Sequence, residues 1–466
     1  MTLKIVSQIL WIMEFVEGHV SLADKQFTEK DKLRPTPQII SNQWVLIQAG
    51  YNMNDFYQAA LNIAKKKLFS DLIPGKLHSP RLGTGGGFVD IFLWDTVFCS
   101  HWAKYHMDEF PMEDSIDNFY LCQEPDGFIS RQIRSDGKSK WSKAYPVSFA
   151  PPLLSWLELD LYVGGFQKNR LERVYPALCK LHEFNKKWRR ADGLYFSDMW
   201  GCGMDDIPRW DDQTDTDSPG INISRAAVLE DGEYGDQSYK FMTDNPHCNF
   251  NWNRQIGWVD TNCQIAFDCL NLSKIATILK RTQEARNYRN EHDALAALIN
   301  EKMFHEKCGF YCDCTGTRLI NHMHIGGFWA LISEVATPER ANRLMEHLCD
   351  PETFGLPCGV PGIARNDSCF GLDERHYWTG PAWCPTEYMV LCGVRTYQEE
   401  TLAKELATRF YNATYRIWEK TGTIWENYSP MQCEQPSPAA GRDFCGWSAL
   451  APITIFLEFV NKSNNA

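Results

Sequence analysis

The chain has 466 residues, enough for two or three ordinary domains or for one large repetitive barrel. Its 44% hydrophobic and 23% charged residues are typical of a well-packed globular protein and give no sign of disorder. The formal net charge of −12 excludes a nucleic-acid partner, because proteins bind nucleic acids mainly through basic groups that neutralise phosphates.

The N-terminal segment has features of a signal peptide, an apolar stretch followed by a possible cleavage site at residues 21–23. Gln8 and Glu14 interrupt the apolar stretch, and a packed amphipathic helix explains the pattern at least as well. We therefore expect residues 1–50 to form a helical or extended segment and the protein to be cytoplasmic. No later run of about eighteen apolar residues predicts a membrane span.

Helical periodicity dominates the chain from about residue 53, whereas strand signals are few. One apolar run opens after Pro151-Pro152 and closes at Gly164-Gly165, and another helix starts at Thr337-Pro338. The predicted buried helix faces consist of Leu171, Val174, Leu178, Leu181 and Phe184; Ile265, Cys269, Leu272 and Ala276; Ala341, Leu344 and Leu348; and Leu402, Leu406 and Phe410.

The seventeen cysteines include no CxxC pair, so neither a disulfide framework nor a zinc ribbon is predicted. Cys308, Cys312 and Cys314 form the tightest group, but no histidine accompanies them at metal-ligand spacing. We expect free, partly buried thiols and a reducing compartment.

Four long segments rich in Gly, Asp and Trp separate the predicted helices, at residues 79–96, 191–222, 357–385 and 421–447. They exceed the usual connection of about five residues, and long ordered loops usually carry function. The sequence also contains 17 Trp, 18 Tyr and 26 Phe, and flat aromatic faces suit the stacking of sugar rings. Most of these aromatic residues are nevertheless expected to fill a core.

Taken together and in order, these segments resemble the inverting α-glycosidases of the trehalase and glycoside hydrolase family 63 group, including its mannosylglycerate hydrolase-like members. The resemblance covers about residues 80–460 and implies an all-α (α/α)6 barrel, which we place at residues 51–466 with residues 1–50 packed on it. The segments that carry it read GTGGGFVDIFLWDTVF (83–98), DGLYFSDMWGCGMDDIPRW (192–210), YWTGPAWCPTEYMVL (377–391), GTIWENYSP (422–430) and GRDFCGWSALAPI (441–453).

The resemblance assigns roles to individual residues. Gly203-Met204-Asp205 matches the context of the family's general acid, and Glu426-Asn427-Tyr428 matches that of its general base. It implies hydrolysis of a small α-glucoside or α-mannoside with inversion and without a cofactor. The implied sugar-binding residues are Trp94, Asp95, Arg131 or Gln132, Tyr377, Trp378, Gly380, Trp383, Trp425 and Trp447.

Two positions depart from the trehalase pattern. Trehalases have an arginine in a Pro-Gly-Gly-Arg-Phe segment, where this chain has Gly85-Gly86-Gly87-Phe88. Thr379 follows Trp378 where an Arg or Asp is usual. Trehalose itself is therefore not the expected substrate.

The chemistry of the two acids is understandable from their neighbours. Inverting hydrolysis needs one protonated and one ionised carboxyl group, separated by enough space for a water molecule. Met204 and Trp210 flank Asp205 with apolar groups, which predicts a raised pKa. Asn427 and Tyr428 offer polar groups that would stabilise an ionised Glu426.

Other interpretations remain open. Asp205 is equally placed to pair with Arg209 as a structural ion pair, Glu426 to cap a helix, and Trp94 to belong to the core. The acidic run 211–217 has the composition of a calcium loop but lacks the glycine and terminal glutamate of an EF-hand, so a solvated lid is favoured. The alternative functions are a non-catalytic sugar-binding protein or a sugar isomerase or epimerase that transfers protons through His322, His324 or His376.

Overall fold

The computed structural model divides the chain into two units, Met1–Ile39 and Ile40–Ala466. The first unit lies outside the described residues, as does the packing expected for residues 1–50. Within the second unit the structure describes residues 55–67, 77–78, 81–85, 88–140, 149–165, 168–197, 201–205, 207–209, 256–316, 318–440, 443 and 446–461.

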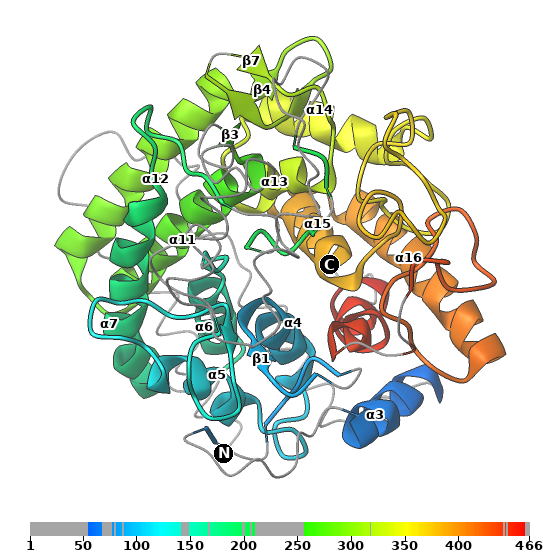
Figure 1. The fold of residues 1–466 in the computed structure, drawn as a ribbon, viewed down its shortest axis with the longest axis horizontal. Coiled ribbons are helices and arrows are strands. Elements are labelled where there is room, and N and C mark those ends of the chain that lie inside the picture. Colours follow the sequence, from blue (N-terminus) through cyan, green and yellow to red (C-terminus); the bar gives the residue numbers. More distant parts are fainter. Residues whose placement is uncertain are drawn as a thin grey trace, which may run out of the picture. The chain divides into compact units, whose positions relative to one another are not determined.

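The described helices of the second unit form an inner and an outer ring, and the chain alternates between them (Figure 1). The inner helices are apolar on nearly all sides: every residue of α4 is buried, for example. A helix that is hydrophobic all round requires neighbours on every side, which an inner position provides. The inner helices are α4 (Leu93–Ala103), α6 (Leu154–Val163), α11 (Val259–Ile278), α13 (Trp329–Ile332), α15 (Cys384–Thr396) and the π-helix η6 (Ala451–Val460).

The outer helices bury one stripe and expose the rest. In α12 the described buried side chains are only those of Ala285, His292, Leu295 and Ile299, which follow a helical spacing along one face. This alternation confirms the predicted (α/α)6 barrel. The outer helices are α3 (Asp55–Lys67), α5 (Met112–Leu121), α7 (Lys168–Asn185), α12 (Thr282–Lys302), α14 (Pro338–Cys349) and α16 (Glu400–Thr421).

Short strands and 3-10 turns connect the rings. The sheets are small and antiparallel: β1 pairs with β2, β4 pairs with β5, and β6 lies between β3 and β7. The remaining elements are β1 (Ile91–Phe92), β2 (Gln132–Ile133), η3 (Lys186–Trp188), β3 (Ile256–Gly257), β4 (Phe304–His305), β5 (Phe310–Tyr311), β6 (Cys314–Thr315), β7 (Arg318–Leu319), η4 (Ile325–Phe328) and η5 (Gly446–Leu450).

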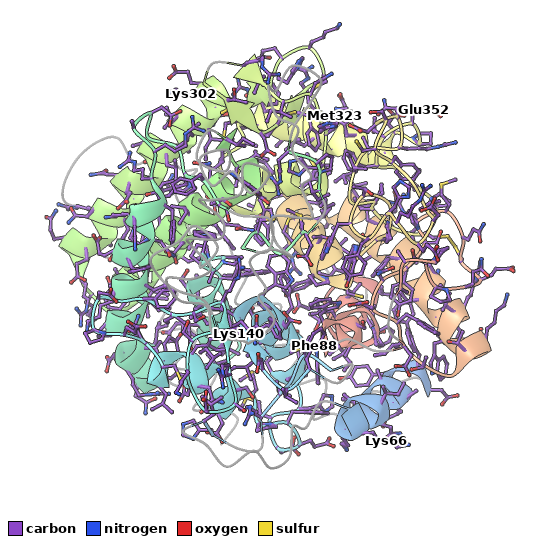
Figure 2. The ribbon with its side chains drawn as sticks, in the orientation of Figure 1. Lys66, Phe88, Lys140, Lys302, Met323 and Glu352 are labelled. Carbon is purple, nitrogen blue, oxygen red and sulfur yellow. A yellow bond between two sulfur atoms is a disulfide. The ribbon has the colours of Figure 1, made fainter. Side chains whose placement is uncertain are left out.

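Side chains fill the space between the two rings (Figure 2). The predicted apolar faces lie in this core, with Phe184 and Leu402 partly exposed at its margin. The Thr337 hydroxyl caps α14 by accepting a hydrogen bond from the Arg340 amide, as its position before Pro338 predicted. None of the described helices is both long and apolar enough to cross a membrane.

The cysteine prediction is wrong at one pair. Cys358 and Cys433 form a disulfide, with their Cα atoms 5.9 Å apart, although 75 residues separate them in sequence. The fold brings together two loops that no local spacing rule connects. The bond also removes the basis for the reducing compartment, because disulfides persist mainly in oxidising environments. Cys308, Cys312 and Cys314 are free thiols as predicted.

Candidate active site

The first turn of the inner helix α4 carries Trp94 and Asp95. The segment 79–96 therefore ends in a strand and a helix, where the sequence predicted a loop throughout. The β1–β2 pair holds this turn, because the Leu93 amide donates to the Arg131 carbonyl oxygen at 2.8 Å. Both Trp94 and Asp95 are 7% exposed.

The loop that carries Asp205 packs directly on Trp94. Gly203 has a φ of +80°, and a Cβ atom there would lie 2.8 Å from the Trp94 ring, so only glycine fits. Met204, one of the two apolar neighbours predicted for Asp205, is fully buried, as is Ile207. Asp205 itself is half-buried, whereas Asp206 and Trp210 lie outside the described residues.

Arg209 anchors the far end of this loop through partners other than Asp205. Its guanidinium group donates to Asp260 at 2.7 and 3.2 Å and to Asp313 at 3.0 and 3.1 Å. It also stacks on Trp258 at 4.4 Å. The interpretation of Asp205 as the ion-pair partner of Arg209 is therefore wrong, because the guanidinium group pairs instead with two buried acids, Asp260 from α11 and Asp313 from the β5–β6 connection.

Sequence reasoning missed Asp260 and Asp313 as supports of the site. A signal for Asp260 exists: Trp258-Val259-Asp260 opens the long apolar helix α11, much as Trp94-Asp95 opens α4. Asp313 is 104 residues from Arg209 and carries no comparable signal.

Glu426 is 3% exposed, and the Tyr377 hydroxyl donates to its Oε1 at 2.7 Å. The neighbours predicted to stabilise its charge point elsewhere. The Tyr428 hydroxyl accepts a hydrogen bond from the Trp425 amide, and the Asn427 side chain donates to a backbone carbonyl oxygen. The stabilising donor is thus Tyr377, from a different loop.

Two further contacts fix the loop that carries Glu426. Trp447 Nε1 donates to the Glu426 carbonyl oxygen at 3.2 Å, and the Ser448 hydroxyl donates to the Trp425 carbonyl oxygen at 2.5 Å. Ala382 and Tyr428 form an antiparallel bridge, which joins this loop to the aromatic segment after Tyr377. The predicted aromatic and base segments therefore form one unit.

The structure brings Asp95, Asp205 and Glu426 together. Burial raises the pKa of Asp95 to about 8, an effect that the Thr84 side chain and the backbone amide oppose. The Asp205 and Glu426 carboxylates are close enough to raise it further. Three acids that lie up to 331 positions apart, from 95 to 426, thus share one electrostatic environment.

We expect Asp95→Asn to be more stable than the wild type at neutral pH. With a folded-state pKa of about 8 against an ordinary 3.8, Asp95 keeps a proton in the folded state that the unfolded state has lost between these pH values. The wild-type free energy of unfolding should therefore fall as pH rises through this window, by up to about 1.4 kcal/mol per pH unit.

Urea unfolding of both proteins between about pH 5 and 9 measures this effect. The stability difference should widen with pH and level off above about pH 8. A difference that stays constant across the range would show that Asp95 is already ionised in the folded protein.

The predicted aromatic residues do not all offer a face to a ligand. Trp378 and Trp383 stack with ring centroids 3.9 Å apart and an interplanar angle of 7°. Trp383 has no exposed surface and donates from Nε1 to the Tyr377 carbonyl oxygen, so it lies as a support behind the loop. Tyr377 and Trp425 are half-buried and are the most accessible members of the predicted set.

Gly380 and the pair Arg131 and Gln132 also have defined positions. A Cβ atom on Gly380 would collide with the Gly371 carbonyl oxygen, so this glycine permits two backbone segments to touch. Arg131 is 7% exposed. The Gln132 amide nitrogen donates to Asp90 at 2.8 Å, which fixes the side chain beside β1.

The histidines named by the isomerase alternative each have an acidic neighbour. His324 is buried and accepts a hydrogen bond from the Gly326 amide. Each ring nevertheless lies beside a different carboxylate: His322 beside Asp367 at 2.8 Å, His324 beside Asp313 at 3.2 Å, and His376 beside Asp373 at 2.9 Å. This arrangement does not favour two histidines acting on opposite faces of one sugar.

A cavity of about 560 Å³ lies apart from these carboxylates and does not mark the site. Its lining includes Lys187, Arg190 and Phe196 but none of the predicted site residues. The acidic run 211–217 lies outside the described residues, so the structure does not bear on its interpretation as a lid or a calcium loop.

Comparison with known proteins supports the resemblance. Residues 91–448 match the family described as the mannosylglycerate hydrolase MGH1-like glycoside hydrolase domain. The mannosylglycerate hydrolase of Rubrobacter radiotolerans is 24% identical over 319 residues, which cover 62% of this chain and 68% of that protein. The mannosyl-oligosaccharide glucosidase of Saccharomyces cerevisiae is 25% identical over 214 residues, but the match spans only 41% of this chain and 25% of the yeast protein.

Solved structures agree on the fold. The GH63 mannosylglycerate hydrolase of Thermus thermophilus, in complex with glucose, superposes with a TM-score of 0.64 at 19% identity over 85% of this chain and 99% of that one. The neutral trehalase Nth1 of Saccharomyces cerevisiae gives a TM-score of 0.57 at 16% identity over 82% and 74% of the two chains. The family match extends over more than three quarters of the sequence, and it confirms the expected enzyme class, an O-glycosyl hydrolase. The chain belongs to the mannosylglycerate hydrolase MGH1-like glycoside hydrolase family.

Proposed function

We propose that the protein hydrolyses a small α-glucoside or α-mannoside with inversion, with Asp205 as general acid and Glu426 as general base. The observation that carries this proposal is the shared environment of Asp205 and Glu426 around Asp95. Inverting glycosidases need two carboxyl groups that flank one sugar, about 6.5–9.5 Å apart.

The different surroundings of the two acids support their assigned roles. Glu426 accepts a hydrogen bond from the Tyr377 hydroxyl group at 2.7 Å, and a hydrogen bond to a carboxylate stabilises the ionised form against the opposing effect of burial. It would deprotonate the water molecule that attacks the anomeric carbon. Asp205 lies half-buried on an apolar loop above Trp94 and would donate its proton to the departing oxygen.

Asp95 would accept hydrogen bonds from sugar hydroxyl groups in the cleaved subsite. A carboxyl group at the first turn of α4 has a fixed position, because the backbone around it is held by β2. Tyr377 would line the sugar, since it is half-buried and contacts Glu426, and Trp94 and Trp425, which precede Asp95 and Glu426 in the chain, are proposed to do the same.

The aglycone is proposed to be small and different from glucose. The relatives include enzymes named mannosylglycerate hydrolase and trehalase. The glycine run at 85–87 and Thr379 depart from the trehalase pattern, which favours a glycosylglycerate or a related small glycoside over trehalose.

A substrate panel with product analysis tests this proposal. Glycosylglycerates, α-linked disaccharides and trehalose should be incubated with the protein while NMR follows the product anomers from the first minutes. Inversion of an α-glycoside must release the β-anomer first. Release of the α-anomer first, or epimerisation without hydrolysis, would overturn the proposal.

A further inference from the structure

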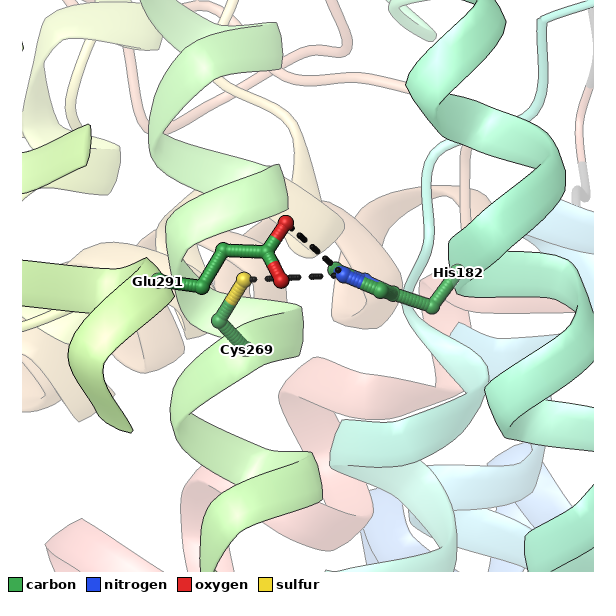
Figure 3. Close-up of side chains that lie close together, drawn as sticks. All are labelled: His182, Cys269 and Glu291. Atoms are coloured by element: carbon green, nitrogen blue, oxygen red, sulfur yellow. Dashed lines mark hydrogen bonds and ion pairs between the residues drawn. The ribbon is translucent and has the colours of Figure 1, made fainter. Parts of the chain in front are cut away.

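A second cluster of chemically active side chains lies between the helices α7, α11 and α12. His182 comes from α7, Cys269 from α11 and Glu291 from α12, and their side chains converge on one point (Figure 3). His182 Nε2 lies 3.3 Å from Glu291 Oε1 and 3.9 Å from Cys269 Sγ. One potential ligand atom from each residue lies within 4.8 Å of the other two.

These separations are close to those around a tetrahedral zinc ion. With zinc bonds of about 2.0–2.1 Å to nitrogen and oxygen and about 2.3 Å to sulfur, the edges of a tetrahedron are about 3.3 Å for N to O and about 3.6 Å for N to S. The first separation matches, and the second requires the sulfur atom to move by only a few tenths of an ångström. Imidazole, thiolate and carboxylate are also the three ligand types that zinc takes from proteins.

The surrounding contacts prepare His182 for this role. Its Nδ1 lies 2.7 Å from Asp268 Oδ2, and Ser155 donates to the other oxygen of Asp268 at 2.5 Å. A carboxylate that accepts the Nδ1 proton fixes the ring and leaves the Nε2 lone pair for a metal, as in the carboxylate–histidine–zinc arrangement. Asp268 and Cys269 are adjacent on α11, so a single helix turn supplies both the ligand and the orienting acid.

Glu291 connects the cluster to solvent. Its side chain is 27% exposed, whereas the His182 side chain has no exposed surface. Lys186 Nζ lies 3.3 Å from Glu291 Oε2. Binding through Oε1 alone would leave this ion pair in place, so Lys186 and a metal need not compete for the same oxygen.

We propose that His182, Cys269 and Glu291 form a binding site for zinc or a chemically similar divalent transition metal, with water in the fourth position. The site would connect three helices, because each ligand comes from a different one. Cys269 lies nine positions after Asp260 on α11. Asp260 binds Arg209, which anchors the loop that carries Asp205. The metal would therefore brace the scaffold of the site, and this role does not depend on the proposed reaction.

The cluster also has an interpretation without a metal, in which His182 is protonated and forms ion pairs with Asp268 and Glu291. The two interpretations differ in the part played by the thiol. An ion pair needs only the carboxylates, whereas a zinc site needs Cys269 as a thiolate.

Metal titration of the whole protein separates them. The purified protein, stripped with a chelator and handled under an inert atmosphere that protects the free thiols and keeps the Cys358–Cys433 disulfide, should be titrated with Zn²⁺ by calorimetry and with Co²⁺ by absorption spectroscopy. We expect one Zn²⁺ per chain at this site and a sulfur-to-cobalt charge-transfer band. Cys269→Ser should abolish the band, and Cys269→Ser and Glu291→Gln should each weaken Zn²⁺ binding by a factor on the order of 100.

Matched variants control for nonspecific effects. Cys263→Ser removes another buried thiol from α11, and Glu301→Gln removes an exposed carboxylate from α12; both should keep the band and the affinity. Asp268→Asn should weaken Zn²⁺ binding by a factor of about 10 to 100 while keeping the band, because it orients His182 without binding the metal. The absence of Zn²⁺ binding in the folded wild type, or binding that survives both ligand substitutions, would overturn the proposal. Hydrolysis by the metal-free protein would leave the proposed function intact.

Discussion

Asp205→Asn should lower turnover of natural substrates by a factor on the order of 10² to 10⁴ while substrate binding survives. The asparagine side chain keeps the shape of the acid but cannot supply the proton that the departing oxygen needs. Calorimetric titration with substrate provides the binding control. Because Arg209 is paired with Asp260 and Asp313, replacement of the Asp205 carboxyl group should not disturb the loop anchor.

The size of this loss should depend on the leaving group. With an α-glycosyl fluoride, the departing atom needs less protonation, so Asp205→Asn should recover most of its activity on that substrate. Glu426→Gln should show no such recovery, because the attacking water still lacks its base. Asp206→Asn changes the adjacent carboxyl group and serves as the matched control, with activity close to the wild type.

Other activity patterns of the two variants would change the roles assigned to Asp205 and Glu426. Undiminished hydrolysis of substrates with poor leaving groups by Asp205→Asn would make Asp205 a structural residue. Rescue of Glu426→Gln by the fluoride, with no rescue of Asp205→Asn, would exchange their roles.

The outer helices were predictable from sequence because their apolar residues repeat along one face, as in α7 and α14. The inner helices are harder to recognise. In α11 the predicted positions from Ile265 to Ala276 still repeat at helical spacing, but every residue of α4 is buried, so hydrophobic periodicity carries little information in α4. This explains why the segment 79–96 was predicted as a loop although it ends in the first turn of α4.

In the candidate site, too, residues in a recognisable local sequence context were predictable, whereas contacts between distant parts of the chain were not. Asp205 and Glu426 stand in recognisable local contexts that resemble a known family. Their supports are long-range: Tyr377 reaches Glu426 from 49 residues away, and Arg209, which anchors the loop of Asp205, bonds Asp313 across 104 residues. No spacing rule connects such pairs, because only the closure of the barrel brings them together.

Arg209→Met is expected to destabilise the protein by about 3–5 kcal/mol. Arg209, Asp260 and Asp313 are almost fully buried, so removal of the guanidinium group leaves two acids in a medium that solvates them poorly. Burial alone would raise the pKa of Asp313, but Arg209 and His324 hold it well below its usual range. Urea unfolding gives the free energy change, and Arg173→Met is the matched control.

Arg173 pairs with Asp117 at 2.9 Å, but its side chain is 53% exposed, so its loss should cost less than about 1 kcal/mol.

If the destabilisation by Arg209→Met comes from uncompensated charge, adding Asp260→Asn and Asp313→Asn should restore part of the stability, because the amides need no counter-ion. The restored variant should nevertheless remain slow in hydrolysis, since the loop between Gly203 and Arg209 has lost its anchor to α11 and Asp205 is no longer held over Trp94. If the triple variant regained full activity with its stability, Arg209 would act on the fold alone and not on the position of the acid.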